Sequence, residues 1–306
     1  MALLLAFSST CSAWADTPNA TVPFRVAGYL PSYRIAKFDA QAAGGLTDLF
    51  IFSAQLAKDG SLDVAQLKNV PWPKLLHFKN KHGVRLILTI GGWKKSQNFA
   101  AVAGSDEKRK RCAQSVAKFA MEKKLDGIDL DWEHPKNAEE EIGYGQLLTE
   151  LRKTLGQRGL LLSVTIAPQQ QLTPAAVKAV HYVQLMSYDH GGKHSTLEQA
   201  RKDVKVLLNA KVPASKIVLG MPFYGRDIQR RTAMSYRDIV SNFSPATDAD
   251  QVGQIFFNGP ETIGKKTNLA IQSKLAGVMV WELGQDAKGD QSLLKVIHKT
   301  VREGGK

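Results

Sequence analysis

The sequence is poor in cysteine, long apolar runs and nucleic-acid motifs. It has two cysteines, Cys11 and Cys112, and Cys11 lies in a segment that we expect to be removed, so an internal disulfide is excluded in the mature chain. Beyond residue 15 no apolar run reaches the roughly 20 residues of a membrane span, so we expect no membrane insertion. Zinc-finger, leucine-zipper and RNA-recognition signatures are also absent, and we expect no nucleic-acid partner.

Positive charge is abundant but not concentrated. The net charge is +13, and Lys and Arg recur along helix-like stretches such as residues 107–111 and 193–216. Charges spread in this way are typical of solvated helix faces, not of a basic tail that binds nucleic acid.

The first fifteen residues have features of a signal peptide. A short apolar stretch precedes Ala-Trp-Ala at positions 13–15, which resembles a cleavage site, although no Lys or Arg precedes Leu3. We expect residues 1–15 to be a signal peptide and the protein to be secreted or periplasmic. With 306 residues, of which 43% are hydrophobic, the chain can form one large core, and we expect residues 16–306 to form a single domain.

Short apolar runs alternate with polar or helix-patterned sequence along the whole chain. This order is typical of an α/β fold with parallel strands, and eight runs over this length predict a (β/α)8 TIM barrel. In such a barrel functional groups lie at the C-terminal ends of the strands. The eight runs are residues 24–30, 47–54, 84–91, 125–133, 160–167, 181–188, 216–224 and 276–283.

The fourth run carries a row of acids. Side chains alternate between the two faces of a strand, so Asp129, Asp131 and Glu133 share one face and the three apolar residues between and before them share the other. Neighbouring carboxyls repel each other when ionised, so at least one pKa should be raised, and that group could act as a general acid. A solvent-facing strand is the plainer interpretation. A calcium loop of the EF-hand type is excluded because His134 stands where the pattern needs glycine.

These residues resemble the signature of glycoside hydrolase family 18, the chitinase family. The signature DxxDxDxE falls on Asp126, Asp129, Asp131 and Glu133, and the resemblance extends over residues 24–302. Further matches are Thr-Ile-Gly-Gly at 89–92 for the SxGG motif, Met-Ser-Tyr-Asp at 186–189 for MxYD, and the GxPFYGR-like segment 220–226. Asp126 lies off the acid face, and we predict that it has a structural role at the strand end.

The resemblance implies substrate-assisted, retaining hydrolysis of β-1,4 bonds between N-acetylglucosamine units. Glu133 would act as general acid and base, and Asp131 would orient the 2-acetamido group. Asp129 would share a proton with Asp131, and Tyr188 would hydrogen-bond the acetamido oxygen. A conventional covalent intermediate with two carboxyls stays open on strand spacing alone.

The resemblance also implies sugar-binding positions at other strand ends. Aromatic walls are expected from Tyr29 and Phe52, and a floor from Trp281. For four of these positions another role is possible. Phe52 could pack in the core, and Trp93 could cover the core as a lid. Trp281 could have a structural role, and Arg226 could form an ion pair. The full set is Tyr29, Phe52, Trp93, Met186, Asp189, Arg226 and Trp281.

We therefore predict an exported, endo-acting chitinase that acts on chitin or N-acetylglucosamine oligomers as a monomer, without cofactor or metal. An endo-β-N-acetylglucosaminidase acting on N-glycans and a chitin-binding lectin are the alternatives, and the presence of Glu133 argues against the lectin. Residues 227–274 resemble a shortened form of the insertion that deep-cleft members carry before the last strand, which implies a shallow groove. No appended carbohydrate-binding module is visible.

Overall fold

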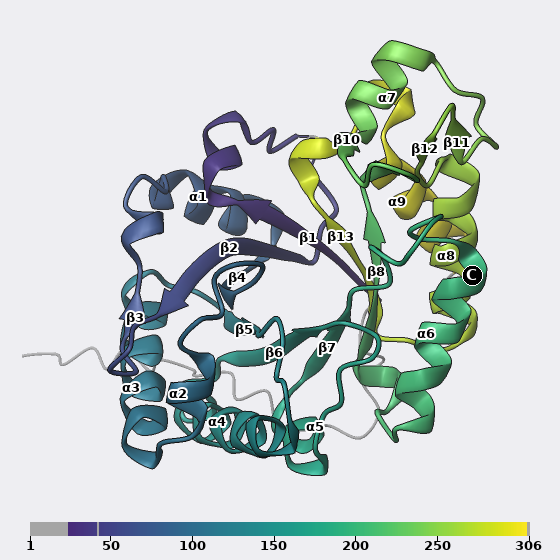
Figure 1. Ribbon diagram of the computed structural model, residues 1–306. Helices are drawn as coiled ribbons and strands as arrows, with labels where there is room; N and C mark the ends of the chain where they lie inside the picture. Colours follow the sequence, from purple (N-terminus) through teal and green to yellow (C-terminus); the bar gives the residue numbers. More distant parts are fainter. Residues whose placement is uncertain (1–23, 42, 305–306) are drawn as a thin grey trace, which may run out of the picture.

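The computed structural model describes residues 24–41 and 43–304, so the predicted signal peptide lies outside the described residues. Parallel strands form a closed barrel (Figure 1). These strands are β1 (Arg25–Pro31), β2 (Asp48–Leu56), β4 (Arg85–Gly91), β5 (Gly127–Asp131), β6 (Leu161–Ile166), β7 (Tyr182–Leu185), β8 (Ile217–Pro222) and β13 (Gly277–Trp281). β1 pairs with both β2 and β13, which closes the ring. Each of the eight predicted runs overlaps one of these strands, with β1 and β2 extending one and two residues beyond their runs, so the TIM barrel is confirmed.

Helices follow the strands around the outside of the barrel (Figure 1). They are α1 (Trp72–His82), α2 (Phe99–Ala103), α3 (Asp106–Glu122), α4 (Ala138–Gly156), α5 (Pro174–Ala179), α6 (Leu197–Asn209), α8 (Pro260–Gln272) and α9 (Leu293–Gly304). Several begin at a residue whose side chain accepts a hydrogen bond from the first turn, as Asn137 does for α4 and Thr196 for α6. No helix within the described part of the chain combines the length and apolar character required to cross a bilayer.

Apolar side chains form two layers. The larger one lies between strands and helices and includes Ile128, Leu130 and Trp132. The smaller one lies inside the barrel and is largely aromatic, with Tyr29 and Phe50 among its members. Because strand side chains alternate, the same strands supply both layers.

A small antiparallel sheet follows β8. Its strand order is β10-β9-β12-β11, formed by β9 (Tyr224–Asp227), β10 (Ala233–Ser235), β11 (Gln251–Val252) and β12 (Ile255–Phe256), and it accompanies helix α7 (Tyr236–Phe243). In Figure 1 this group lies at the upper right, beyond the end of β8. α8, which ends the segment 227–274, instead packs against β8 and β13 of the barrel.

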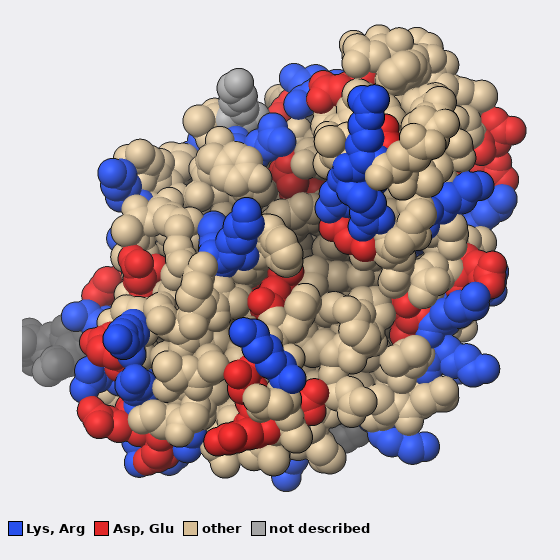
Figure 2. All heavy atoms as spheres, in the orientation of Figure 1, with Lys and Arg blue, Asp and Glu red and all other residues tan. Residues whose placement is uncertain are grey.

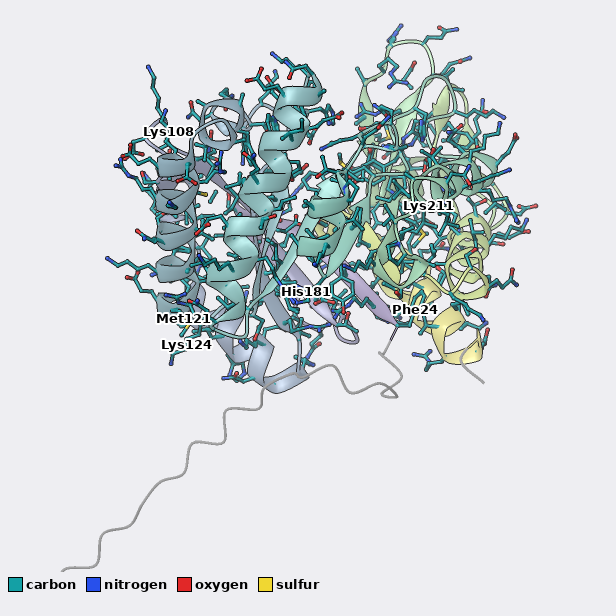
Figure 3. All side chains as sticks on the ribbon, turned by 90° about the horizontal axis from the view of Figure 1, so that it is seen from below. Phe24, Lys108, Met121, Lys124, His181 and Lys211 are labelled. Atoms are coloured by element: carbon teal, nitrogen blue, oxygen red, sulfur yellow. The ribbon has the colours of Figure 1, made fainter. Side chains whose placement is uncertain are left out.

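Charged side chains close the N-terminal end of the barrel. Figure 3 shows Phe24, Lys124 and His181, which shortly precede β1, β5 and β7, toward the same edge of the molecule. At the first residue of β2, Asp48 accepts hydrogen bonds from Arg25 at 2.9 Å and from Arg85 at 3.1 Å. Asp126, just before β5, accepts from Lys79 Nζ at 2.7 Å and from the Leu86 backbone N–H at 2.8 Å. Asp126 thus bonds the start of the neighbouring strand, in line with the structural role predicted for it.

Candidate active site

The acid row points into the barrel. Asp129 is fully buried, Asp131 is 3% exposed, and the Glu133 side chain is 14% exposed, so exposure rises toward the C-terminal end of β5. The apolar residues that alternate with the acids belong to the outer layer. Figure 2 shows that this face of the molecule is hollowed near its middle, with acidic side chains in the hollow and Lys and Arg side chains around it. The acids therefore share one face, as the alternation predicted.

Hydroxyl groups surround Asp129 at the bottom of the row. Ser163 and Thr165 of the neighbouring strand β6 donate to its carboxylate at 2.6 and 2.8 Å. The Tyr29 hydroxyl donates at 3.1 Å and the Thr89 hydroxyl at 3.3 Å. Burial raises the pKa of Asp129 to about 6, although these donors favour the ionised form. No cation among the described residues forms an ion pair with Asp129, and with a pKa of about 6 the carboxyl can change its protonation state close to neutral pH.

Asp131 lies in the middle of the row, and its carboxyl is only partly satisfied. Its Oδ1 atom is buried without a hydrogen-bond partner among the residues that the structure describes. Burial raises the pKa of Asp131 well above its usual value, and the charges of Glu133 and Asp129 raise it further. A buried polar atom without a partner is uncommon in native proteins and calls for an explanation, such as a ligand that completes it.

Paired glycines allow the strands to approach Asp131 closely. Gly91 and Gly92 have φ of 101° and 99°, a conformation that side chains other than glycine rarely adopt. A Cβ atom at Gly91 would lie 2.2 Å from the Asp131 carbonyl oxygen, and one at Gly92 would lie 2.3 Å from the Phe52 ring. The Gly92 N–H donates to that carbonyl oxygen at 2.7 Å. The glycine pair thus lets the end of β4 pack closely beside the acid row.

Glu133 lies at the upper, more exposed end of the row. Burial raises the pKa of Glu133, and the charge of Asp189 adds to this, while His134 and a hydrogen bond from the Trp93 backbone N–H act in the opposite direction. The Glu133 backbone N–H donates to Ser96 Oγ at 3.1 Å. A carboxyl with a raised pKa at the edge of a hollow suits a general acid.

Three aromatic rings pack together beside the acids. The Trp281 ring lies 4.7 Å from the Phe52 ring in an edge-on arrangement and 5.6 Å from the Tyr29 ring. Tyr29 also stacks on Phe50 at 4.6 Å and is only 1% exposed. Tyr29 was predicted to form a wall of the sugar site, but its ring lies below the surface and its hydroxyl hydrogen-bonds Asp129. Trp281 remains partly exposed, and Phe52 and Met186 belong to or contact the same cluster.

Tyr188 lies opposite the acids, in the segment that follows β7. Its side chain is 9% exposed, and burial together with the charges of Tyr224, Asp131 and Asp189 raises its pKa well above the usual value. Within the described part of the chain, nothing hydrogen-bonds the Tyr188 hydroxyl. The hydroxyl is therefore protonated and available as a donor to a ligand.

Asp189 forms an ion pair with Arg226. Arg226 Nη2 lies 2.6 Å from Asp189 Oδ2, Nε donates to Oδ1, and the Tyr224 hydroxyl donates to Oδ1 at 2.7 Å. Burial opposes ionisation of Asp189, but the hydrogen bonds from Arg226, His194 and Tyr224 hold its pKa well below the usual range. Of the two interpretations open for Arg226, the geometry shows ion pairing.

Trp93 stands apart from the aromatic cluster. Its side chain is 68% exposed, so it is no lid on the core, and its backbone N–H reaches the Glu133 carboxyl. An exposed indole next to a hollow offers an apolar plane to a ligand. No cluster of His, Cys, Asp and Glu in the described ranges is arranged to hold a metal ion.

Several residues of the site were not predicted. Ser163, Thr165 and Ser96 hydrogen-bond the acid row from other elements, and Tyr224 and His194 surround Asp189. Strand register was the missing signal for two of them, since Asp129 lies opposite Ser163, and Asp131 opposite Thr165. The hydroxyl of Ser96 had no signal in the sequence, because it comes from an irregular segment after β4.

Comparison with known proteins places the chain in a family. The model of family 18 of the glycosyl hydrolases matches residues 25–286. Chitinase 1 of Aphanocladium album is 29% identical over 285 residues, and the alignment covers 72% of this chain and 66% of that protein. Probable chitinase 2 of Drosophila melanogaster is 24% identical, with 93% and 77% of the two chains covered.

Solved structures agree with this result. The GH18 chitinase ChiB from the chitin utilization locus of Flavobacterium johnsoniae is 28% identical and has a TM-score of 0.81, with 92% of this chain and 95% of that chain covered. The chain spans about two thirds of the length of the Aphanocladium relative and nearly all of the Flavobacterium structure. From the family match and the barrel with its acid row, this chain belongs to family 18 of the glycosyl hydrolases.

Proposed function

We propose that this chain is an endo-acting chitinase that hydrolyses β-1,4 bonds between N-acetylglucosamine units by substrate assistance. The observation that carries the proposal is the buried Oδ1 of Asp131, which has no hydrogen-bond partner among the described residues and lies in the row between Asp129 and Glu133. The N–H of a 2-acetamido group would complete it. Relatives described as chitinases support the choice of substrate.

Glu133 supplies and later recovers the proton. Burial raises the pKa of Glu133 and so favours its protonated form, which can protonate the oxygen that leaves the anomeric carbon. The acetamido carbonyl oxygen of the substrate attacks that carbon as the glycosidic C–O bond breaks, and this gives an oxazolinium ion. Water then attacks the same carbon, loses a proton to the Glu133 carboxylate and releases the acetamido oxygen. The anomeric carbon is inverted twice, so the configuration is retained.

Asp131 and Asp129 stabilise the positive charge that develops in the acetamido group. Asp131 accepts the acetamido N–H and faces the charge, as preorganised groups do in a site shielded from water. Asp129, with its pKa of about 6, can hold a proton when Asp131 gives one up, and the two carboxyls titrate as a pair. The donors around Asp129 prepare it for the ionised form.

The remaining residues hold the sugar. Tyr188 donates from its unpartnered hydroxyl to the acetamido oxygen, and Trp281 forms the floor beneath the reacting sugar. Trp93 and Phe52 flank it, and the Asp189 carboxylate contacts a sugar hydroxyl while Arg226 keeps it ionised. Tyr29 acts from below by orienting Asp129. The small sheet after β8 forms a low wall, which favours cleavage within chains over processive action. Export through residues 1–15 and action as a monomer belong to the same proposal.

Replacement of Glu133 by Gln tests the proposal. Hydrolysis of N-acetylglucosamine oligomers should fall by roughly 10² to 10⁴-fold or more, because the proton donor is lost, while binding of the oligomers persists. Retained hydrolysis in Glu133→Gln would remove the assignment. Fully deacetylated oligomers should resist the unmodified enzyme, and their ready cleavage would indicate a covalent intermediate. Cleavage of high-mannose glycoprotein without cleavage of chitin oligomers would favour the endo-β-N-acetylglucosaminidase.

A further inference from the structure

The segment that carries Tyr188 and Asp189 is irregular. β7 ends at Leu185, and the Met186 N–H makes a last bond to β6, to the Ile166 carbonyl at 2.9 Å. The next two N–H groups bond within the segment, from Ser187 to the Leu185 carbonyl and from Tyr188 to the Met186 carbonyl, both at 2.8 Å. Asp189 has φ of 65°, which is uncommon for a residue other than glycine. No strand pairing holds these two side chains toward the hollow, so their positions depend on other contacts.

Ser195 fixes this segment from behind. Its hydroxyl donates to the Ser187 carbonyl oxygen at 2.8 Å, one residue before Tyr188. Ser195 in turn is held by its own neighbours, since Asn258 Nδ2 donates to its backbone carbonyl at 2.7 Å. Ser195 is buried, so water does not compete for these bonds. A displaced Ser195 would therefore release the Ser187 carbonyl.

Lys266 holds Ser195 with a buried ammonium group. Lys266 lies in α8, is fully buried, and donates from Nζ to Ser195 Oγ at 2.7 Å, Ser195 O at 2.9 Å and Asn258 Oδ1 at 2.7 Å. Three acceptors use all three ammonium hydrogens. No carboxylate of the described residues lies within ion-pair distance of Lys266. Burial lowers the pKa of Lys266 to about 7, because a buried cation held only by neutral acceptors is costly. Simple helix packing would be served better by an apolar residue.

A second anchor acts on the same residue. The Ser187 hydroxyl donates to Asp203 Oδ2 at 2.6 Å, and His190 Nε2 lies 2.9 Å from the same oxygen. Ser187 is thus held by its carbonyl through Ser195 and by its side chain through Asp203. From the surrounding elements, the charges of Asp250 and Asp203 raise the pKa of Lys266, against the larger opposite effect of burial. The charge of Lys266 in turn lowers the pKa of His194.

We propose that Lys266 is a positioning residue for the reaction, which through Ser195 fixes the Ser187 carbonyl and thereby the Tyr188 hydroxyl at the mouth of the barrel. This inference rests on the proposed function, in which Tyr188 donates to the acetamido oxygen. Lys266 itself is buried away from the hollow and touches no substrate. Its effect on the reaction should therefore pass entirely through Tyr188.

The test compares Lys266→Met with a matched variant of the same helix. Lys266→Met should lower kcat for N-acetylglucosamine oligomers roughly ten- to a hundredfold, because a small displacement of a positioned group is enough for such a loss. Thr267→Val removes a buried hydroxyl whose one hydrogen bond within the described part of the chain is to Ile263 O in α8, and it should leave kcat within about twofold of the unmodified chain. Ser195→Ala is the milder variant and decides the question if Lys266→Met does not fold.

A double-mutant cycle separates positioning from a general structural role. In a Tyr188→Phe background, Lys266→Met should lower kcat by no more than about twofold further, since the hydroxyl that it positions is already gone. A loss as large as in the unmodified background, or a folded Lys266→Met with unchanged kcat, would overturn the inference. The unmodified chain in the same assay is the reference. If it does not hydrolyse the oligomers, the proposed function fails. If it does, and folded Lys266→Met has the same kcat, only the positioning role of Lys266 is overturned.

Discussion

Asp48 at the N-terminal end of the barrel and the neighbours Asp129 and Asp131 toward the other end are buried acids with opposite surroundings. At the N-terminal end, Asp48 is buried and contacts the guanidinium groups of Arg25 and Arg85, both at 2.9 Å. At the C-terminal end, Asp129 and Asp131 are as deeply buried, yet only hydroxyl groups reach Asp129 and no group hydrogen-bonds Asp131 Oδ1 among the described residues. The same fold thus pairs one set of acids and leaves the other without cations.

The pKa directions express this difference. Burial raises the pKa of both Asp129 and Asp131, which means that their ionised forms are less stable in the folded chain than in water. At the other end, Asp48 instead forms ion pairs with Arg25 and Arg85. Acids that are paired support the fold, and acids that are left unpaired lower stability but can bind a ligand and move protons. The next four changes test this division between stability and function.

Asp131→Asn should have the largest effect. Hydrolysis of N-acetylglucosamine oligomers should fall roughly 10² to 10³-fold, because the group that faces the developing charge becomes neutral. Unfolding in urea should show no loss of stability, since a carboxyl whose ionised form is disfavoured has been replaced by a neutral amide. A variant that keeps more than about a tenth of the activity would remove Asp131 from the reaction.

Asp48→Ala should have the opposite signature. It leaves Arg25 buried without its carboxylate and should lower the free energy of unfolding by about 3 kcal/mol. The kcat of the folded enzyme should stay unchanged, because Asp48 lies at the end of the barrel away from the acid row. Urea unfolding and oligomer hydrolysis measure the two quantities. A folded Asp48→Ala chain with strongly reduced kcat would mean that the two ends are coupled.

Asp129→Asn should change how stability depends on pH. The pKa of Asp129 is raised from its usual 3.8 to about 6, so between these values the folded chain binds more protons than the unfolded chain. Stability therefore falls as pH rises through this window, and the asparagine variant avoids that loss. Relative to the unmodified chain, it should gain roughly 2 kcal/mol in unfolding free energy between about pH 4 and about pH 7. If the unfolding free energies of the two chains depended on pH in the same way, the raised pKa of Asp129 would be contradicted.

Lys79→Met should have the smallest effect. Its partner Asp126 lies at the closed end, but both side chains are about a quarter exposed, at 23% and 27%. Partly exposed pairs contribute about 1 kcal/mol or less, and salt should weaken this one further. Urea unfolding at low and high salt measures it. If Lys79→Met lowered the unfolding free energy as much as Asp48→Ala, solvent exposure would not explain the difference between the Lys79–Asp126 pair and the buried pairs of Asp48.

Much of the site was predictable because its acids lie on one short stretch, β5 and the two residues that follow it. Strand alternation places Asp129 and Asp131 on one face, and Glu133 follows them two residues beyond the end of β5. The barrel was predictable for a similar reason, since each apolar run is a local pattern. The position of Tyr29 was not predictable, because its hydroxyl hydrogen-bonds Asp129, which lies 100 residues further along the chain.

The sequence by itself determined the alternating pattern that makes the barrel and the order of acids along β5. Only the tertiary structure decided which buried charges receive partners. That decision depends on strand register and on segments without a repeating pattern, which bring Ser163 to Asp129, Arg25 to Asp48 and Lys266 to Ser195. A local pattern specifies a side chain's face, but the distance between two faces is set only when the ring closes.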